Sequence, residues 1–408
     1  MGRAFLEGRV NVDLVSTLKS KSFFELAVPE PFRIFFPIGL LLGAIGVALW
    51  PLFVWHAINF YPRDAHLRLM IEGLMGSFII GFLGTAGPRL LDAPPFRAIE
   101  TYLLLALQLA VAGLQLKQRR NAGDIVFLLT LVLFLSFVGK RARTRQDLPP
   151  PNFVLVILGF LNAIAGIVFI FGSRRATSGA AFFDQFGSLL LNEGFVLFPI
   201  LGVGAFFFPK LLGGAKPEPA DLNIAISLWK KRALIAALTG VVIWISFVLE
   251  ALEWTRTAAV VRGSAVLFYF ALQGHLFERP SGPPFLAHCF RFGAVLLIVA
   301  FFFPLALPTY RLANMHLAFI GGFTIILFTV STRVILGHSG YTHLFQKRLY
   351  FLIVALVLLI VTMLARVGAD FFPPERNSHL VYAALIWLMA TAIWAWALLP
   401  KLLVNEEE

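Results

Sequence analysis

The chain has 408 residues, of which 59% are hydrophobic and only 14% are charged. Soluble domains carry about a quarter charged residues, so the composition excludes an ordinary soluble protein and predicts a polytopic membrane protein in a lipid bilayer. The formal net charge of +12 comes largely from short loops between apolar runs. That pattern favours contact with anionic lipid and argues against nucleic acid binding.

The single cysteine, Cys289, lies in an apolar segment. It excludes an intrachain disulfide and a Cys-rich metal site, and its simplest interpretation is a small buried hydrophobe. The sequence does not begin with the pattern of a cleaved signal peptide, which is a charged region, a short apolar run and a cleavage site of small residues. We therefore expect the first transmembrane helix to direct insertion.

Apolar runs recur along the whole sequence after a mixed segment, 1–30, in which an interfacial helix is expected near Val12–Phe24. A spanning helix needs roughly 20 mostly apolar residues. The runs predict about twelve such helices, at about 33–58, 65–88, 97–117, 123–140, 152–173, 180–209, 233–254, 257–277, 286–308, 312–335, 349–368 and 379–400.

Basic residues are unevenly distributed between the two alternating sets of loops. The richer set contains Arg89 and Arg97, the cluster 140–145, the segment 210–232, and Lys347 with Arg348. Because cytoplasmic loops carry the excess of Lys and Arg, we expect this side to face the cytoplasm. Both termini would then be cytoplasmic, in the cell inner membrane.

Two predicted spans align without a gap. EGLMGSFIIGFLGTAGPRLL begins at Glu72, and EGFVLFPILGVGAFFFPKLL begins at Glu193, 121 residues later. A further step of 123 residues reaches His316 and places Arg333 opposite Arg89 and Lys210. Each step contains four spans, which predicts three tandem four-helix units around a pseudo-threefold axis along the membrane normal.

The repeat divides the chain into five parts. Residues 1–30 form an N-terminal cytoplasmic or interfacial segment, and 403–408 form an acidic C-terminal tail. The three units occupy 31–148, 149–282 and 283–402.

Ionisable residues inside spans are costly, at roughly 2.5–3.5 kcal/mol on insertion scales. Glu72 and Glu193 lie within equivalent helices, His316 begins the third, and His66 lies at the mouth of the second span. Under the repeat these residues converge near the outer leaflet. They either form a cofactor or proton site, or the glutamates hold the bundle together by pairing with Arg262 or Arg366 or by bonding to Ser and Thr. Two histidines strengthen the first interpretation, because neutral imidazole is the usual axial ligand of haem iron.

Other polar groups favour structural roles. Arg89, Lys210 and Arg333 close the cytoplasmic ends of equivalent helices, where they complement the helix dipole and anionic headgroups. A substrate or cofactor role for Arg333 is the alternative. His338 and His343 lie in GHSGYTH, expected to be a cytoplasmic loop, and could bind a metal, but no third ligand is evident.

Two stretches resemble the NnrS family of haem- and copper-containing membrane proteins, associated with relief of nitric oxide stress. They are PFRIFFPIGLLLGAIGVALW with IIGFLGTAGPRLLDAPPF, and HLAFIGGFTIILFTVSTRVILGHSG from His316 to Gly340. The family tends to show His-Ala-His-Glu at the head of the second helix, where this chain has His66, Leu67, Arg68 and Leu69. This degenerate motif makes copper doubtful.

The arrangement also resembles haem-copper oxidases in topology, with histidines on the second and tenth helices. This likeness is an analogy of fold. It implies a haem between His66 and His316 without a neighbouring copper, since the sixth and seventh spans contain no histidine.

Three hypotheses follow. The first is an NnrS-like haem protein that holds haem b between His66 and His316, with Glu72, Glu193 and Arg333 in the cofactor-binding set, and acts in the nitric oxide response. A small gas such as nitric oxide or a redox partner would interact with it. The second is a cofactor-free transporter or channel with a polar path lined by Glu72, Glu193 and Arg262. The third is a membrane assembly factor. Whether the protein is an enzyme stays open.

Overall fold

The described part of the chain, residues 23–212, 222–280 and 285–404 of a computed structural model, contains helices as its only regular elements. The helices fall into three stretches of the chain, 23–143, 153–272 and 285–403. The first stretch contains α1 (Phe23–Ala27), α2 (Phe32–Val54), α3 (Arg63–Arg68), the π-helix η2 (Leu69–Met75), α4 (Gly76–Leu90), α5 (Ala98–Leu116) and α6 (Arg120–Arg143). The expected interfacial helix near Val12–Phe24 falls almost entirely outside the described residues.

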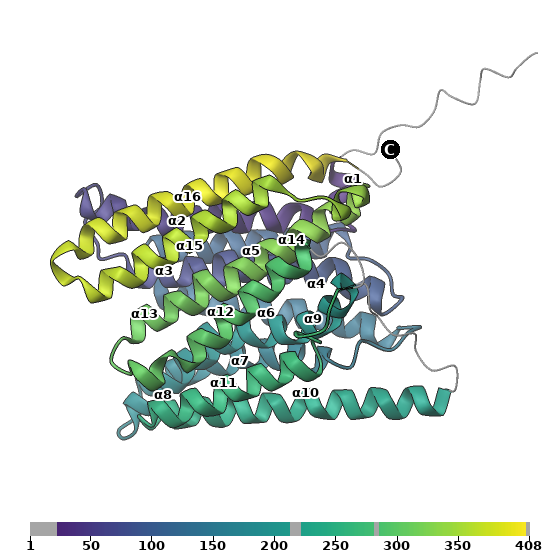
Figure 1. The fold of residues 1–408 in the computed structure, drawn as a ribbon, viewed down its shortest axis with the longest axis horizontal. Coiled ribbons are helices and arrows are strands. Elements are labelled where there is room, and N and C mark those ends of the chain that lie inside the picture. The colour runs from purple at the N-terminus through teal and green to yellow at the C-terminus, as the bar shows by residue number, and fades with distance from the viewer. Residues whose placement is uncertain (1–22, 213–221, 281–284, 405–408) are drawn as a thin grey trace, which may run out of the picture.

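The second stretch contains α7 (Phe153–Ser173), α8 (Ala180–Ser188), the π-helix η3 (Leu189–Gly194), α9 (Phe195–Leu211), α10 (Leu222–Ala251) and α11 (Thr255–Leu272). The third contains α12 (Phe285–Ala306), α13 (Arg311–His316), the π-helix η4 (Leu317–Thr324), α14 (Ile325–His338), η5 (Thr342–Gln346), α15 (Tyr350–Phe371), η6 (Pro373–Glu375), α16 (Arg376–Leu398) and η7 (Leu399–Leu403). Figure 1 shows the long helices with roughly parallel axes, with α10 along one edge and α16 along the opposite edge.

Eleven helices among the described residues are long and apolar enough to cross a membrane. This finding confirms the predicted all-helical polytopic membrane class. The predicted span 257–277 corresponds to α11, which is not one of the eleven. This helix has 18 residues and includes Arg256 and Arg262, which lower its hydropathy. It nevertheless packs against α10 and α12 like its neighbours.

The same neighbour pattern recurs in each stretch. The first long helix packs on the helix that follows it, so α2 contacts η2 and α4, α7 contacts η3 and α9, and α12 contacts η4 and α14. The next two helices form the hairpins α5–α6, α10–α11 and α15–α16. The end of each stretch packs on the start of another, through α6–α7, α11–α12 and α16–α2, which closes a ring. This pattern supports the repeat, while the pseudo-threefold axis and the unit boundaries stay predictions.

Three continuous helices lie deepest in the bundle, and we call them the inner helices: α3–η2–α4, α8–η3–α9 and α13–η4–α14. In their most apolar windows 89%, 83% and 72% of residues are buried, against 67% or less in the other eight spans. The inner helices are also the ones that the sequence repeat aligns. Each contains a π-helical segment near its start.

Glycines allow α2 to approach the first inner helix closely. A Cβ added at Gly39 would lie 2.9 Å from the Phe78 ring, and one at Gly46 would lie 2.9 Å from Cβ of Leu69. Helices in lipid associate mainly through such close packing, because lipid tails are as apolar as the side chains themselves. The stripe Gly39, Gly43 and Gly46 therefore explains why α2 lies against the core.

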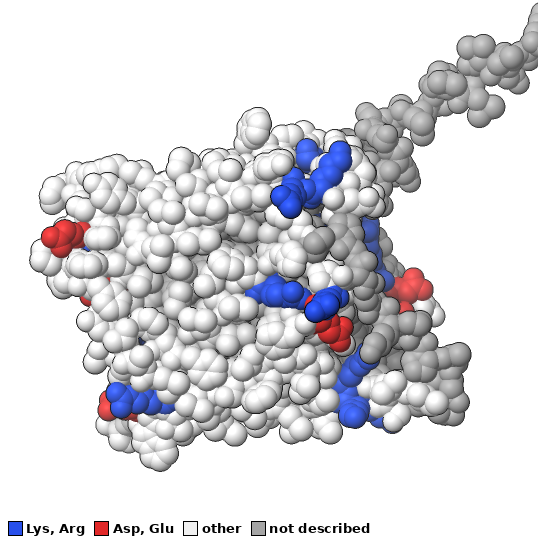
Figure 2. Space-filling model, in the orientation of Figure 1, with Lys and Arg blue, Asp and Glu red and all other residues white. Residues whose placement is uncertain are grey.

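The two ends of the bundle differ in charge. We call the end where the inner helices finish, near Arg89, Lys210 and Arg333, the basic end, and the end where they begin the histidine end. On the face seen in Figure 2, most Lys and Arg side chains lie at one end and the broad middle is uncharged. Lys230, Lys231 and Arg232, predicted to be in a loop, instead lie exposed within α10. That helix is 30 residues long and so exceeds the roughly 20 residues that a bilayer needs.

Candidate functional site

The π-helical segments coincide with the ionisable residues singled out in the inner helices. Glu72 lies inside η2, Glu193 lies inside η3, and His316 directly precedes η4. A π-helix inserts an extra residue into a helical turn and often marks a functional site. The three positions lie at the histidine end, as the repeat predicts, but each has a different set of partners.

Glu72 belongs to a fully buried polar cluster around Arg68. The Arg68 guanidinium donates to Oδ2 of Asp124 at 3.1 Å and to Oδ1 of Asn192 at 3.1 Å, and its Nε lies 3.4 Å from Oε1 of Glu72. Gln115 bridges the two acids, donating to Oε2 of Glu72 and Oδ1 of Asp124 at 3.1 Å each. Glu72 therefore pairs with Arg68, and neither Arg262 nor Arg366 is its partner.

Glu193 belongs to a second cluster, centred on Arg262. The two ion pairs of this arginine are 2.8 Å to Oε1 of Glu193 and 2.6 Å to Oε2 of Glu250. Its Nε donates to the Ser246 hydroxyl at 3.1 Å. The predicted pairing of Glu193 with Arg262 is present. Two carboxylates around one buried guanidinium form a compensated structural network that holds η3, α10 and α11 together.

The third position carries histidines where the other two carry acids. Nδ1 of His316 lies 2.7 Å from the carbonyl oxygen of Leu312, and Nδ1 of His66 lies 3.0 Å from that of Gly46. Arg366, itself paired with Asp370 at 3.3 Å, lies close enough to both histidines to act on them electrostatically. His66 and His316 also lie close enough to interact with one another.

The imidazoles of His66 and His316 have the arrangement that an axial haem ligand requires. A carbonyl oxygen can only accept, so Nδ1 of each ring carries the proton. Nε2 of each ring then presents a lone pair and makes no hydrogen bond with any residue that the structure describes. Second-sphere hydrogen bonds of this kind orient metal-ligating histidines and fix their tautomer. Each of these two imidazoles therefore fits a ligand of haem iron.

Copper does not fit in the same way. Among the described residues, no three His, Cys, Asp or Glu side chains gather where they could hold one metal ion. Arg68 occupies the place of the second histidine in the family motif, and it is engaged with Asp124. We therefore derive no copper chemistry for this chain.

The basic end contains a separate polar cluster that includes His338. Its Nδ1 donates to Oε1 of Glu30 at 2.8 Å, and Glu30 also pairs with Arg89 and, at 2.7 Å, with Nε of Arg33. Arg33 donates further to the carbonyl oxygens of His338 and Leu402. Burial raises the pKa of the Glu30 carboxyl, but the His338 hydrogen bond and the Arg33 charge outweigh this effect, so the pKa lies below its ordinary value.

His338 was expected in a loop but is the last residue of α14. Its hydrogen bond to Glu30 gives it a structural role. His343 lies in η5, is exposed, and faces Tyr341 at 6.1 Å between ring centroids. Arg333 also lies at the basic end. It is roughly 25 Å along the helix from His316, at about 1.5 Å per residue. The structure thus does not bring Arg333 or these histidines to His66 and His316.

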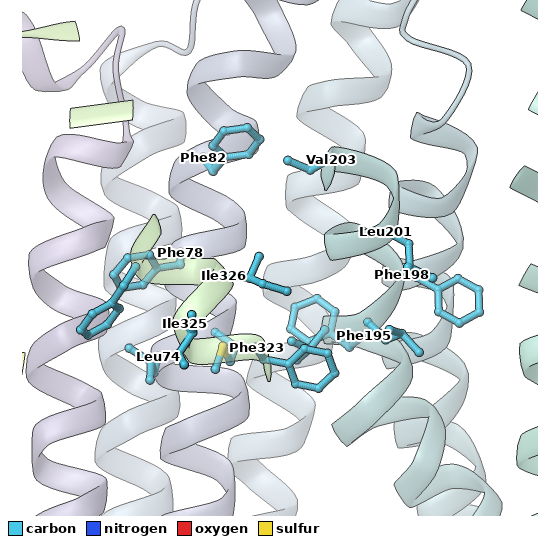
Figure 3. Close-up of a cluster of buried hydrophobic side chains, with 14 of the residues drawn as sticks. Leu74, Phe78, Phe82, Phe195, Phe198, Leu201, Val203, Phe323, Ile325 and Ile326 are labelled. Carbon is cyan, nitrogen blue, oxygen red and sulfur yellow. The ribbon is translucent and has the colours of Figure 1, made fainter. Parts of the chain in front are cut away.

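Two cavities lie between the inner helices. The larger, about 300 Å³, opens at the basic end and is lined by Phe82, Thr85, Phe207, Arg333, His338 and Thr342 among others. The smaller, about 60 Å³, lies deeper and is lined mainly by apolar side chains. Figure 3 shows Phe82, Val203 and Ile326, one from each inner helix, beside this space. Glu72, Glu193 and Arg262 line neither cavity.

A comparison with protein-family models matches residues 27–405 to the NnrS protein family. The chain belongs to the NnrS family. The match includes every spanning helix described above, so the predicted membership is confirmed and the whole bundle is the family domain. No curated protein sequence matches the chain.

The contacts of Arg68 and Asp124 in this NnrS chain were missed from the sequence. The spacing of Arg68 and Glu72 by four residues is a signal for a pair on one helix face. Asp124 begins the predicted fourth span and was one more ionisable group in an apolar segment. Its partner lies 56 residues earlier in the chain, so only the tertiary structure identifies it.

Proposed function

We propose that this NnrS-family protein is a membrane haem protein of the nitric oxide response, with haem b bound between His66 and His316. The observation that supports it is the matched pair of imidazoles, each with Nδ1 on a backbone carbonyl and Nε2 free of protein partners. The family membership supplies the expectation of haem.

The residues of the chain would each contribute to such a site. His66 and His316 would ligate iron through Nε2, with Gly46 and Leu312 fixing the ring orientations. Trp50, whose ring lies 5.9 Å from that of His66, would shield the ligand from solvent. Arg366 would place a positive charge beside the bound group. Haem iron with histidine ligands supplies one-electron chemistry or, with a free coordination position, binding of a diatomic gas.

The absorption spectrum of the purified protein, oxidised and reduced, tests this proposal after expression with supplemented haem. We expect a Soret band in the wild type and its loss in His66→Ala and in His316→Ala. His343→Ala, an exposed histidine at the basic end, is the matched control and should keep the band. A wild-type protein with no Soret band would refute the proposal.

The transporter hypothesis receives less support. Its three residues are engaged in compensated networks and line neither cavity between the inner helices. Proton or solute flux in liposomes containing haem-free protein, abolished by Glu193→Gln, would nevertheless favour it over the haem proposal.

A further inference from the structure

Arg333 is exceptional among the arginines of the described chain. It is half-buried, and its guanidinium makes no hydrogen bond and no ion pair with any described residue; it lies only over the Phe345 ring, 4.3 Å from the centroid. All other described arginines that are buried or half-buried have a hydrogen bond or an ion pair: Arg33, Arg68, Arg120, Arg141, Arg262, Arg291 and Arg366.

The unpaired guanidinium lines the 300 Å³ cavity at the basic end. This volume is many times the roughly 30 Å³ share of one water molecule, so the cavity has room for a ligand. Burying a charge without a partner is costly. A counter-ion bound in the cavity beside the guanidinium would remove this cost.

The chemistry of the cavity wall favours an anion. None of its lining residues is acidic, and the exposed Thr342 hydroxyl makes no hydrogen bond with the described residues, so it is available to donate. The neighbouring cluster of Arg33, Arg89 and Glu30 has two guanidiniums for one carboxylate, and His338 of that cluster also lines the cavity. The local charge is therefore positive.

We propose that this cavity is a binding site for a phosphate-type oxyanion, recognised by the guanidinium of Arg333. The planar fork of N–H donors suits tetrahedral oxyanions in particular, and Phe345 packs against its face and holds it in place. The same chemistry has two sources, free inorganic phosphate and the headgroup of an anionic lipid. The site lies at the opposite end of the bundle from His66 and His316 and does not depend on haem.

Thermal unfolding of the full chain in lipid nanodiscs tests the proposal. In phosphatidylcholine nanodiscs, a free-anion site predicts a saturable rise in Tm when phosphate replaces chloride at constant ionic strength. A lipid site predicts instead that phosphatidylglycerol raises Tm without added phosphate. In either arm Arg333→Gln should weaken the apparent affinity by about tenfold or more, and Arg333→Lys should weaken it less.

Arg348→Gln is the matched control, because it removes an exposed positive charge near the same end but not from the cavity wall. It should respond like the wild type. Equal responses of the wild type and Arg333→Gln in both arms would overturn the proposal. A response lost equally in Arg348→Gln would also overturn it, because general electrostatic attraction would then explain the binding.

Discussion

At the scale of single residues, Arg68 shows why the site could be predicted only in part. The family motif has a histidine at this position, and this chain has an arginine instead. It is completely buried and is held by Asp124, Asn192 and Glu72. The cost of charges in lipid correctly identified Glu72, Glu193 and His316 as positions that need partners. The Glu193–Arg262 pairing was among those predicted, and the spacing of Arg68 and Glu72 signals their pair. Asp124 and Asn192, the other partners of Arg68, lie on distant helices, and the spacing of residues in one sequence does not identify them.

Asp124 and Glu72 should differ in their contribution to stability. Asp124 accepts a hydrogen bond from Arg68, whereas Glu72 only approaches it at 3.4 Å. Asp124→Asn leaves the buried cation poorly compensated and should lower the free energy of unfolding by about 3–5 kcal/mol. Glu72→Gln keeps the Arg68–Asp124 pair and should cost about 1 kcal/mol or less. Unfolding of the purified protein in mixed micelles measures both values, and the reverse order would show that Glu72 is the main counter-ion.

Glu30 should give the protein an acid-sensitive contact at the basic end. Its pKa in the folded protein is lowered, so its contribution is complete above the unfolded value of about 4.3 and is lost as the pH falls through the lower folded value. Glu30→Gln should therefore destabilise the protein by about 1–3 kcal/mol at pH 7. The difference from wild type should shrink at acidic pH.

Thermal unfolding of both proteins across a pH series measures this effect. Asp92→Asn, which changes an exposed acid at the same end, should follow the wild type throughout. A difference between wild type and Glu30→Gln that grows below about pH 4.3 would contradict the assigned direction.

At the scale of helices, hydropathy predicted the positions of the spans well but not their internal geometry. The predicted span 180–209 corresponds to a helix that ends at Leu211, yet it contains the π-helical segment η3. Apolar composition alone does not distinguish a π-helical segment from an α-helical one. The sequence also does not reveal which glycines allow close contact between backbones, because a glycine that faces lipid and one that faces another helix cannot be told apart in it.

Gly166 and Gly172 on α7 test this difference. A Cβ at Gly166 would lie 2.7 Å from the carbonyl oxygen of Gly187 and 2.7 Å from the amide nitrogen of Leu191, both backbone atoms. Gly166→Ala must separate α7 from η3 and should cost about 1–3 kcal/mol. Gly172 has open space around it, and Gly172→Ala should stabilise the protein by about 0.5–1 kcal/mol. Equal effects of the two changes on unfolding in mixed micelles would contradict this packing.

At the scale of the whole molecule, the contacts of α16 with α2 join the last and the first long helix of the described chain and close the ring of helices around the inner three. The proposed haem ligands lie at the histidine end of this bundle, and the proposed oxyanion cavity lies at the basic end. The uneven distribution of basic residues between the loops then predicts which end faces the cytoplasm. If the basic end faces the cytoplasm, the haem ligands lie near the outer leaflet and the oxyanion cavity opens to the cell interior.

This orientation can be tested with single cysteines, because the native Cys289 is buried and gives little background. Arg376→Cys places a thiol at the exposed start of α16 at the histidine end, and Arg348→Cys places one at the exposed basic end. In intact spheroplasts a membrane-impermeant maleimide should label Arg376→Cys, because positive loops are retained inside. It should label Arg348→Cys only after lysis. Labelling of Arg348→Cys in intact spheroplasts would invert the bundle and place the proposed haem ligands on the cytoplasmic side.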